Sequence, residues 1–420
     1  MKPGFLLCLL FFVCVSSLFA QRRCASFQYA QQAMRINPSL QTNHGNIEAF
    51  IQSRLRNASS LAINTRPASL QTIEIPVVVH VVYHNQQENI SDVAIAKQLT
   101  ALNRDYQRMN ADSSNTPDAF KVVAADCKIE FVLAKVDPMG RATTGVERVY
   151  SPVERWVIEG DKVKYKSEAG ADGWDSRYYL NIWVCNLDDL LGYSSVMGDD
   201  MKKDGVVINY YVFNDLEDGG AYDSGRTAVH EIGHWLSLKH LWGDADCGDD
   251  DVTDTPKQST FTTGCPSGIR VGCSKSPNGD MYMNFMDYTN DPCMNLFTNG
   301  QRDRMRALFD PGGLRNSILS SKALGTPWVE EIPLAGDSPR WLYPKLYPDP
   351  AQNEVTLDFK YDPRWVGQEL IISNVSGQVL MRHLITSKVE TINISNLNRG
   401  IYFIRGNKEG TKLAEKFIKL

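Results

Sequence analysis

The chain has 420 residues, which is enough for two or three domains. Its 44 basic and 49 acidic residues give a net charge of −5 without a basic cluster, which argues against a nucleic-acid-binding surface. Beyond the first 20 residues, no apolar stretch is long enough to span a bilayer, so no transmembrane anchor is expected.

Residues 1–20 have the pattern of a signal peptide. Lys2 supplies a positive start, and Leu6 to Val15 form an apolar core that is too short for a stable membrane anchor. Small residues then provide a cleavage site before Gln21. The mature protein is therefore expected to be exported, into surroundings where disulfide bonds persist.

Residues 21–65 are polar and mostly helical in character, and they occupy the position of a propeptide. A domain of mixed α and β character is expected at 66–315. The β-branched run from Ile73 to Tyr83 predicts a strand, with His80 in the core rather than a metal ligand. Residues 91–109 carry apolar side chains at helical spacing and predict an amphipathic helix. Further strands are predicted at 128–136, 179–185 and 205–211.

The strongest functional signal runs from His230 to His240 and contains three of the seven histidines. His230 and His234 are four residues apart, so on a helix they share one face and can bind a zinc ion at about 2.0–2.1 Å. Glu231 follows the first ligand, where its carboxylate can reach a water on the metal. His240 lies too far along for that face, so the chain must turn to complete three ligands with an open fourth position, as in catalytic zinc sites.

This motif resembles the metzincin zinc proteases, whose pattern HExxHxxGxxH precedes a Met-turn. Ser237 stands where the glycine is expected, and a left-handed serine there costs about 1–2 kcal/mol. Met286 matches the Met-turn and is expected to form an apolar floor under the zinc. Tyr288 matches a position that is a ligand or an oxyanion donor in some metzincins.

Four cysteines narrow the resemblance to the pappalysin family, particularly its ulilysin-like bacterial members. Spacing alone allows three pairings of four cysteines. The absence of a Cys-x-x-Cys pair in this region argues against a zinc ribbon. The resemblance implies first-to-third and second-to-fourth disulfides, which here are Cys247–Cys273 and Cys265–Cys293. For Cys127 and Cys185, both buried thiols and one further disulfide stay open.

The loop after Cys247 carries four aspartates within six residues, which repel one another unless they are solvated or bind a cation. Hard oxygen ligands favour calcium. The resemblance implies a calcium site in this loop, and Asp250, Asp254 and Thr255 match it. The alternative is a solvated acidic turn.

The segment Arg22-Arg23-Cys24 resembles the cysteine switch of the same family. In such a switch, a thiolate occupies the open zinc position until the propeptide is removed, and thiolate is a strong zinc ligand. The alternatives for Cys24 are a free thiol or a disulfide.

Residues 316–342 are rich in proline and glycine and are expected to form a linker. Residues 343–420 predict an all-β module of the size of a small immunoglobulin-like sandwich. The module resembles the C-terminal sorting domains of type IX secretion in Gram-negative bacteria. The resemblance implies export through the periplasm and contact with the outer-membrane secretion machinery. A carbohydrate-binding sandwich is the alternative. In either case, the strands of residues 343–420 are expected at 369–373, 379–384, 400–405 and 416–420.

These features predict a secreted zinc endopeptidase of α+β metzincin fold. Its catalytic domain would combine a mixed twisted sheet and an active-site helix with an irregular, disulfide-tied lower lobe. Glu231 would take a proton from the attacking zinc-bound water and pass it to the leaving amine, while zinc and Tyr288 stabilise the oxyanion.

Two alternatives remain at this point. A catalytically silent adhesin would not need to retain Glu231. A zinc amidase acting on cell wall would not need a propeptide. The natural substrate is not readable, because relatives that cleave before arginine carry an acidic residue just before the fourth cysteine. Here Pro292 holds that place and Asp291 lies one earlier.

Overall fold

The structure is a computed structural model. The expected signal peptide, Arg22 and Arg23 of the switch motif, and residues 330–342 of the expected linker lie outside the residues that it describes. Within the described residues, no helix combines the length and the apolar character that crossing a bilayer requires. The structure describes residues 24–62, 70–214, 220–273, 276–329, 344–359, 365–408 and 411–420.

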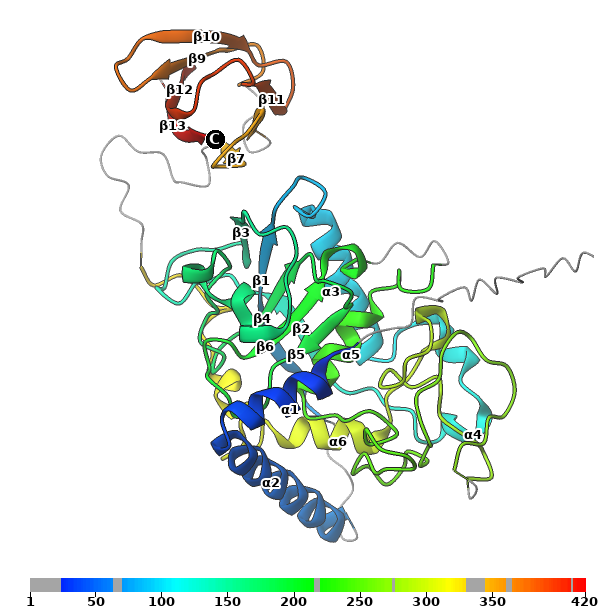
Figure 1. Ribbon diagram of the computed structural model, residues 1–420. Helices are drawn as coiled ribbons and strands as arrows, with labels where there is room; N and C mark the ends of the chain where they lie inside the picture. Colours follow the sequence, from blue (N-terminus) through cyan, green and yellow to red (C-terminus); the bar gives the residue numbers. More distant parts are fainter. Residues whose placement is uncertain are drawn as a thin grey trace, which may run out of the picture.

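A six-stranded mixed sheet lies at the centre of the larger domain (Figure 1). β1 pairs in parallel with β2, β3 and β4, and β4 pairs in parallel with β6. β5 alone runs antiparallel to its neighbour β6, and the order β2-β1-β4-β6-β5 places it at an outer edge. The strands are β1 (Ile73–Tyr83), β2 (Ile129–Leu133), β3 (Val146–Tyr150), β4 (Leu180–Cys185), β5 (Gly192–Ser194) and β6 (Gly205–Asn209).

The sheet is buried on both faces, which explains its continuous apolar strands. In β1 every residue except Glu74 is buried, and all of β4 and β6 is buried. On one face lie α3 (Asp92–Tyr106), whose N-terminus is capped by the Ser91 hydroxyl, and α5 (Arg226–Trp235). The strand predicted at 73–83 is confirmed, and so is the helix predicted at 91–109, although it ends at Tyr106.

The chain after α5 is largely irregular until α6 (Asn299–Ala307). Two disulfides, Cys247–Cys273 and Cys265–Cys293, tie this lobe together in the pairing that the family resemblance implies. Cys127 and Cys185 are separate buried thiols. The other described helices after residue 70 are short: η1 (Ala111–Asn115), α4 (Asp118–Lys121), η2 (Glu159–Lys164), η3 (Lys166–Glu168), η4 (Tyr210–Val212), η5 (Asp291–Cys293) and η6 (Asn316–Ser320).

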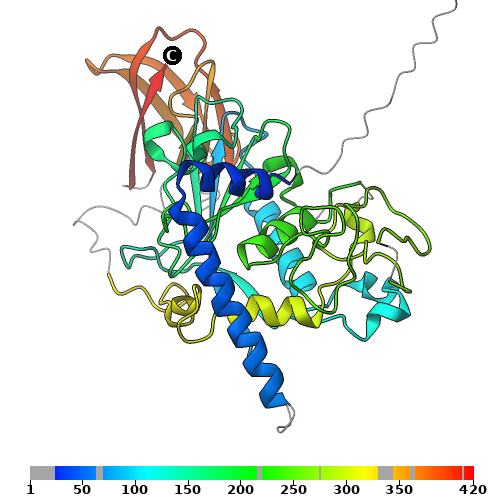
Figure 2. The same ribbon diagram turned by 60° about the horizontal axis from the view of Figure 1, so that its bottom comes forward.

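Residues 24–62, here called the N-terminal segment, lie against the larger domain. The segment consists of Cys24 and Ala25 followed by α1 (Ser26–Ile36) and α2 (Ser39–Ala62). α1 contacts β5, and α2 runs beside α6 (Figure 2). Glu48 of α2 forms an ion pair with the buried Arg304 of α6. Although burial alone would raise the pKa of Glu48, this guanidinium lowers it to about 2.

The larger domain continues past its expected end at residue 315. Ile318 is buried in the main core, and the carbonyl of Ala323 accepts hydrogen bonds from the backbone of residues 135 and 136. The Trp328 indole covers Gly140, where an added Cβ would come within 2.3 Å of the ring. The expectation of a linker from 316 is therefore wrong for residues 316–329, because packing and backbone hydrogen bonds override their loop-like composition.

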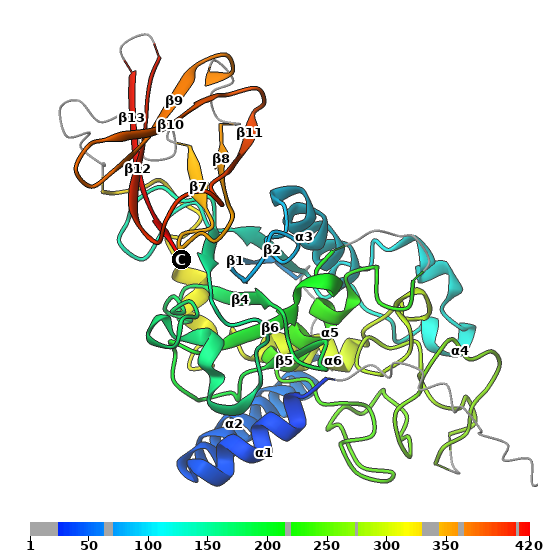
Figure 3. The ribbon, with the colours of Figure 1, turned by 45° about the horizontal axis from the view of Figure 1, so that its top comes forward.

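Residues 344–420 form a module of two antiparallel sheets (Figure 3). The core side chains come from both sheets, for example Leu357 from one and Ile404 from the other, as in a sandwich. One sheet has the order β10 (Val379–Leu384), β9 (Glu369–Asn374), β12 (Gly400–Lys408), β13 (Thr411–Lys419), and the other β11 (Val389–Asn393), β8 (Glu354–Asp358), β7 (Lys345–Tyr347).

Candidate metal centre and active site

Helix α5 carries His230, Glu231 and His234, and it is fixed at its N-terminus by buried charges. The Oδ2 atom of Asp291 accepts hydrogen bonds from the backbone N–H groups of Ser224 and Arg226, at 3.1 and 3.0 Å. A carboxylate at this end also matches the helix dipole. Asp291, the acidic residue nearest the fourth cysteine, is thus buried at the N-terminal end of the helix.

The helix ends at a residue with a left-handed backbone. Ser237 has φ of 78°, the left-handed conformation for which the family motif has glycine at this position. Its N–H bonds to the His234 carbonyl at 2.9 Å, and its own carbonyl accepts from Arg304 Nε at 2.7 Å. Among the described residues, its buried hydroxyl has no hydrogen-bond partner. This strained turn reverses the chain and brings His240 back to the helix.

We expect Ser237→Gly to stabilise the folded protein by about 1 kcal/mol, because glycine adopts this backbone without the steric cost. The melting temperature should rise by about 2–4 °C. Ser237→Ala is the matched control, since alanine removes the unpaired hydroxyl but keeps the strain. Equal gains in the two variants would contradict strain as the cause.

The three motif histidines converge through their Nε2 atoms. The Nε2 atoms of His230 and His234 are 3.1 Å apart, those of His234 and His240 are 3.1 Å apart, and those of His230 and His240 are 3.3 Å apart. Nitrogen ligands placed tetrahedrally at about 2.0–2.1 Å from one zinc ion would be about 3.3 Å apart. The spacing of the donor atoms therefore fits zinc.

Hydrogen bonding on the opposite side of each ring sets the tautomer. Each Nδ1 faces an oxygen acceptor, so each carries the proton and each Nε2 directs a lone pair at the common centre. Three lone pairs at this separation repel one another unless a cation lies between them, so these contacts are better understood as a ligand set than as hydrogen bonds. The acceptors are Phe285 O at 2.7 Å, Leu238 O at 2.8 Å and Asp244 Oδ1 at 2.6 Å.

Met286 packs directly under the helix that carries the ligands. A Cβ added to Gly233 would lie 2.5 Å from the Met286 sulfur, so the motif needs glycine at this position for the methionine to approach. The side-chain oxygen of Asn284 accepts from Met286 N at 2.9 Å, and its amide bonds to Gln301 of α6 at 2.8 Å. Burial raises the pKa of the neighbouring Asp287 to about 6.

Aromatic rings enclose His240. Trp242 stacks on it with ring centroids 4.4 Å apart and an interplanar angle of 4°. The Tyr288 ring lies 5.0 Å from His240 and 5.7 Å from His230, and its hydroxyl donates to the Cys24 carbonyl at 3.4 Å. Sequence reasoning missed Trp242 and Asp244, although both follow the third histidine within one short turn.

The N-terminal segment closes the site. Cys24 Sγ and one nitrogen from each of the three histidines lie within 4.8 Å of one another, and no other metal-binding group of this kind occurs among the described residues. The Ala25 N–H bonds to Gly192 O on β5 at 3.1 Å. Sequence reasoning also missed Ser26, whose hydroxyl donates to Glu231 Oε2 at 2.7 Å and accepts from Ser194 N at 2.8 Å.

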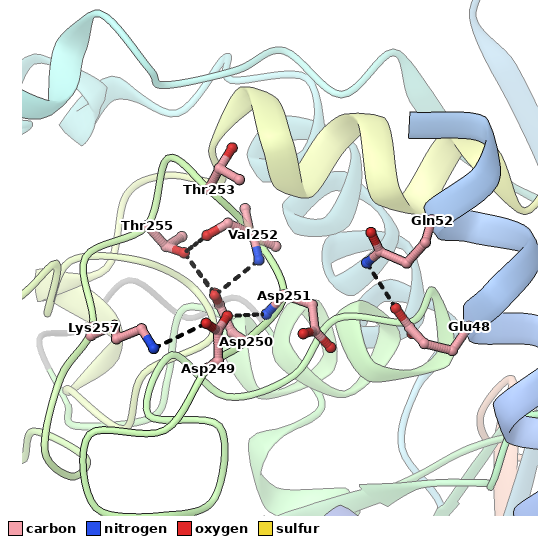
Figure 4. A pocket seen from close by; sticks show the side chains of 9 residues that line it. All are labelled: Glu48, Gln52, Asp249, Asp250, Asp251, Val252, Thr253, Thr255 and Lys257. Atoms are coloured by element: carbon pink, nitrogen blue, oxygen red, sulfur yellow. Dashed lines mark hydrogen bonds and ion pairs between the residues drawn. The ribbon is translucent and has the colours of Figure 1, made fainter. Parts of the chain in front are cut away.

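The acidic loop lines a cavity of about 600 Å³ together with Glu48 and Gln52 of α2 (Figure 4). Asp250 is buried, and its carboxylate accepts from the Thr255 hydroxyl at 2.8 Å and from Val252 N at 3.2 Å. Burial raises the pKa of Asp250 to about 7. The neighbouring carboxylates have lysine partners: Asp249 pairs with Lys257 and Asp251 with Lys239.

Asp254, the fourth aspartate of the run, has hydrogen-bond partners on α6 and just before it. Its carboxylate accepts from the Thr298 hydroxyl at 2.6 Å and from Gly300 N at 2.9 Å, so it caps the N-terminus of α6. The structure thus gives Asp254 a capping role, and its expected part in a calcium site with Asp250 and Thr255 stays a prediction. A helix N-terminus satisfies a carboxylate as well as a cation does, and sequence spacing cannot distinguish the two.

Two histidines on a helix that packs against a mixed sheet, a third histidine brought back by a turn, and a glutamate beside them form the site of a metalloprotease. Residues 164–310 match the family model of peptidase M43, described as pregnancy-associated plasma protein-A, and residues 345–420 match the secretion system C-terminal sorting domain. An extracellular metalloprotease of Arthroderma benhamiae is 30% identical over 294 residues, which cover 67% of this chain and 86% of the relative.

Two solved structures are also similar. Mature mirolysin of Tannerella forsythia, in complex with a cleaved peptide, is 49% identical, with a TM-score of 0.58 and coverage of 60% of this chain and 97% of that one. A promirolysin mutant is 43% identical, with a TM-score of 0.65 and coverage of 73% and 99%.

The chain belongs to the M43, or pappalysin, family of metalloproteases. It is secreted through the type IX system, which implies a Gram-negative bacterium. Membership in a protease family leaves no support for the adhesin and amidase alternatives.

Proposed function

We propose that the chain is a zinc-dependent endopeptidase, made as a latent precursor, that hydrolyses peptide bonds in proteins. The observation that carries the proposal is the convergence of three Nε2 lone pairs beside Glu231. His230, His234 and His240 would hold the zinc. The peptide bound to mature mirolysin supports peptide substrates for this chain as well.

A zinc ion held there supplies Lewis-acid polarisation of the scissile carbonyl and favours ionisation of an attacking water. Glu231 provides the general base: its carboxylate accepts the proton from the water and delivers it to the leaving amine. Gly192 leaves room for this side chain, because a Cβ there would lie 2.9 Å from Glu231 Cγ. The Tyr288 hydroxyl, once released from the Cys24 carbonyl, is placed to donate to the developing oxyanion.

In the precursor, the N-terminal segment would block both the metal centre and the general base Glu231. Cys24 directs its sulfur at the histidine centre, where a thiolate ligand would exclude substrate. The Ser26 hydroxyl donates a hydrogen bond to the Glu231 carboxylate oxygen that must accept the proton of the water. Removal of the segment frees both groups, and the existence of a pro form of mirolysin supports this order of events.

The metal assignment is tested by His240→Ala. Loss of one of three ligands should weaken zinc binding by more than the roughly 10–100-fold that loss of a supporting partner costs. After dialysis, elemental analysis should find zinc in the wild type and little in the variant. His84→Ala serves as a control, because His84 lies outside the centre and contacts the Ser151 carbonyl. Full zinc retention in His240→Ala would exclude His240 as a ligand.

We also propose that the acidic loop binds calcium through Asp250, with the Thr255 hydroxyl and loop carbonyls completing the oxygen ligands. The proposal is supported by the burial of Asp250, which forms none of the ion pairs found among the described residues, while both flanking aspartates are paired. The cavity beside it offers room for a cation.

Calcium at about 100 times its dissociation constant should then raise the free energy of unfolding by about 2.7 kcal/mol. Melting curves are compared in excess calcium and in a calcium-selective chelator with zinc present. Asp250→Asn should abolish the difference, and the exposed Asp246→Asn should keep it. Asp254→Asn should lower the melting temperature equally in both conditions, since it removes a helix cap. Identical wild-type curves would remove the calcium site.

A further inference from the structure

A second cluster of buried polar groups lies near β5 but on the other face of the sheet from α5. Asp161 accepts a hydrogen bond from the Tyr193 hydroxyl at 3.0 Å and another from the Tyr29 hydroxyl. Lys164 Nζ lies 3.2 Å from the same carboxylate. The ammonium also faces three aromatic rings, at 5.4 Å from Tyr29, 5.3 Å from Trp183 and 5.0 Å from Tyr193.

All members of this cluster except Tyr29 belong to the catalytic domain and are fixed there. With the N-terminal segment in place, Asp161 and Lys164 are 3% and 1% exposed. Gly160 and Asp161 both have left-handed backbones, with φ of 76° and 54°, and such strain at a non-glycine residue is typical of functional positions. The Trp183 indole is held by a hydrogen bond to the Ala171 carbonyl at 2.8 Å. The pocket therefore does not depend on the N-terminal segment for its walls.

The charges of the pocket select against ionised side chains. Asp161 and Asp199 are balanced by Lys164 and Lys203, which lies 2.7 Å from Asp199 and 3.9 Å from Asp161. A lysine or arginine entering the pocket would meet the Lys164 ammonium, and a carboxylate would meet Asp161. A neutral ring that carries a hydroxyl satisfies both, because the ring faces the cation and the hydroxyl donates to the carboxylate.

The pocket opens beside the sheet edge that the N-terminal segment occupies. Cys24 pairs with Gly192 on β5, and one helical turn later Tyr29 reaches the cluster. Gly192 faces Glu231, so the next residue, Tyr193, points to the opposite face, where Asp161 lies. A cavity of about 190 Å³ already adjoins Tyr29, Asp161 and Lys203.

Removal of the segment uncovers this edge, and a peptide that pairs with it directs alternate side chains to the Tyr193 face. We propose that the pocket vacated by Tyr29 then becomes a substrate subsite that selects a tyrosine side chain. Tyr29 of the N-terminal segment thus fills the subsite in the precursor, and a tyrosine of the substrate fills it in the activated enzyme. The inference rests on the proposed peptidase function.

The test measures kcat/KM of the activated enzyme on peptides with one scissile bond, in which tyrosine, phenylalanine or lysine is placed at each neighbouring position in turn. A hydroxyl donating to a buried carboxylate should favour tyrosine over phenylalanine by about tenfold at one position. Lysine should be disfavoured there. Absence of a tyrosine preference at every position overturns the subsite, whereas absence of cleavage of all peptides overturns the peptidase function itself.

Asp161→Asn connects the preference to the pocket. Asparagine tolerates the left-handed backbone but does not carry the charge, so the tyrosine-to-phenylalanine ratio should fall to about one. Asp188→Asn, in an exposed ion pair with Arg155, is the control that should keep the ratio. A ratio that persists in Asp161→Asn places the tyrosine elsewhere and overturns the assignment.

A further measurement does not depend on how this variant folds. Synthetic peptides of residues 24–37, with the natural sequence or with Tyr29→Phe, are compared as inhibitors of the activated wild-type enzyme. The natural peptide should inhibit at about tenfold lower concentration. Equal inhibition contradicts recognition of the hydroxyl.

Discussion

Glu231→Gln is expected to lower kcat/KM on protein substrates by at least about 100-fold while zinc content stays at the wild-type level. Glutamine has the shape of the carboxylate but cannot accept the proton of the attacking water. None of the three converging Nε2 atoms is altered, so the metal should remain. So that differences in latency do not enter the comparison, both proteins should be measured after the same added protease has removed the N-terminal segment.

Two measurements make this result specific. Glu154→Gln changes a highly exposed carboxylate far along the chain from the motif and should leave both turnover and zinc unchanged. Elemental analysis of Glu231→Gln separates loss of the base from loss of the metal. Turnover near the wild-type rate in zinc-loaded Glu231→Gln would remove Glu231 from the mechanism.

A chain that ends at residue 335 is expected to keep proteolytic activity but to accumulate in the periplasm of its host. The module from residue 345 matches a sorting domain and packs a core of its own. Its Tyr347 is partly buried against the main core but is not among that core's fully buried residues, so loss of the module should leave the catalytic domain folded. Export should therefore fail completely while casein hydrolysis by the purified, activated protein persists. Fractionation of cells and medium, with activity measured in each, gives both readouts.

The position of the cut matters, because the catalytic domain extends to residue 329. A chain ending at 315 also loses Ile318, Ala323 and Trp328 from their packed positions. Loss of the buried Ile318 side chain alone should cost about 1.5–3 kcal/mol. This shorter chain is the control for folding and should be unstable. Efficient secretion of the 335-residue chain would contradict the sorting role, and secretion without activity would place the module in the catalytic fold.

The candidate metal ligands were predictable because the spacing of the histidines along the chain is enough to predict which of them can meet. A helix brings residues four apart to one face, so His230 and His234 needed no tertiary information, and His240 followed from the need for a turn. Strand β1 was also predictable, since a long β-branched run has few other outcomes. Strand β5 was not, because three residues carry too little periodic signal, although this strand pairs with Cys24 and its Gly192 faces Glu231.

Other features depend on contacts that spacing does not encode. Ser26 and Tyr29 resemble ordinary helix residues until the fold places them beside Glu231 and Asp161. Asp254 and Asp250 look alike in the acidic run, but one caps a helix and the other is buried beside a cavity. The boundary at 315 failed for the same reason, because residues with a linker composition gain their order from backbone pairing with residues 135–140.

The position of β5 at the end of the sheet has a consequence for solubility. An uncovered sheet edge presents unpaired N–H and C=O groups, and such edges template self-association as readily as they bind peptides. β5 limits this hazard by its shortness, and Cys24 and Ala25 cover it in the precursor. The segment that we propose keeps the enzyme latent would therefore also limit self-association through this edge before export.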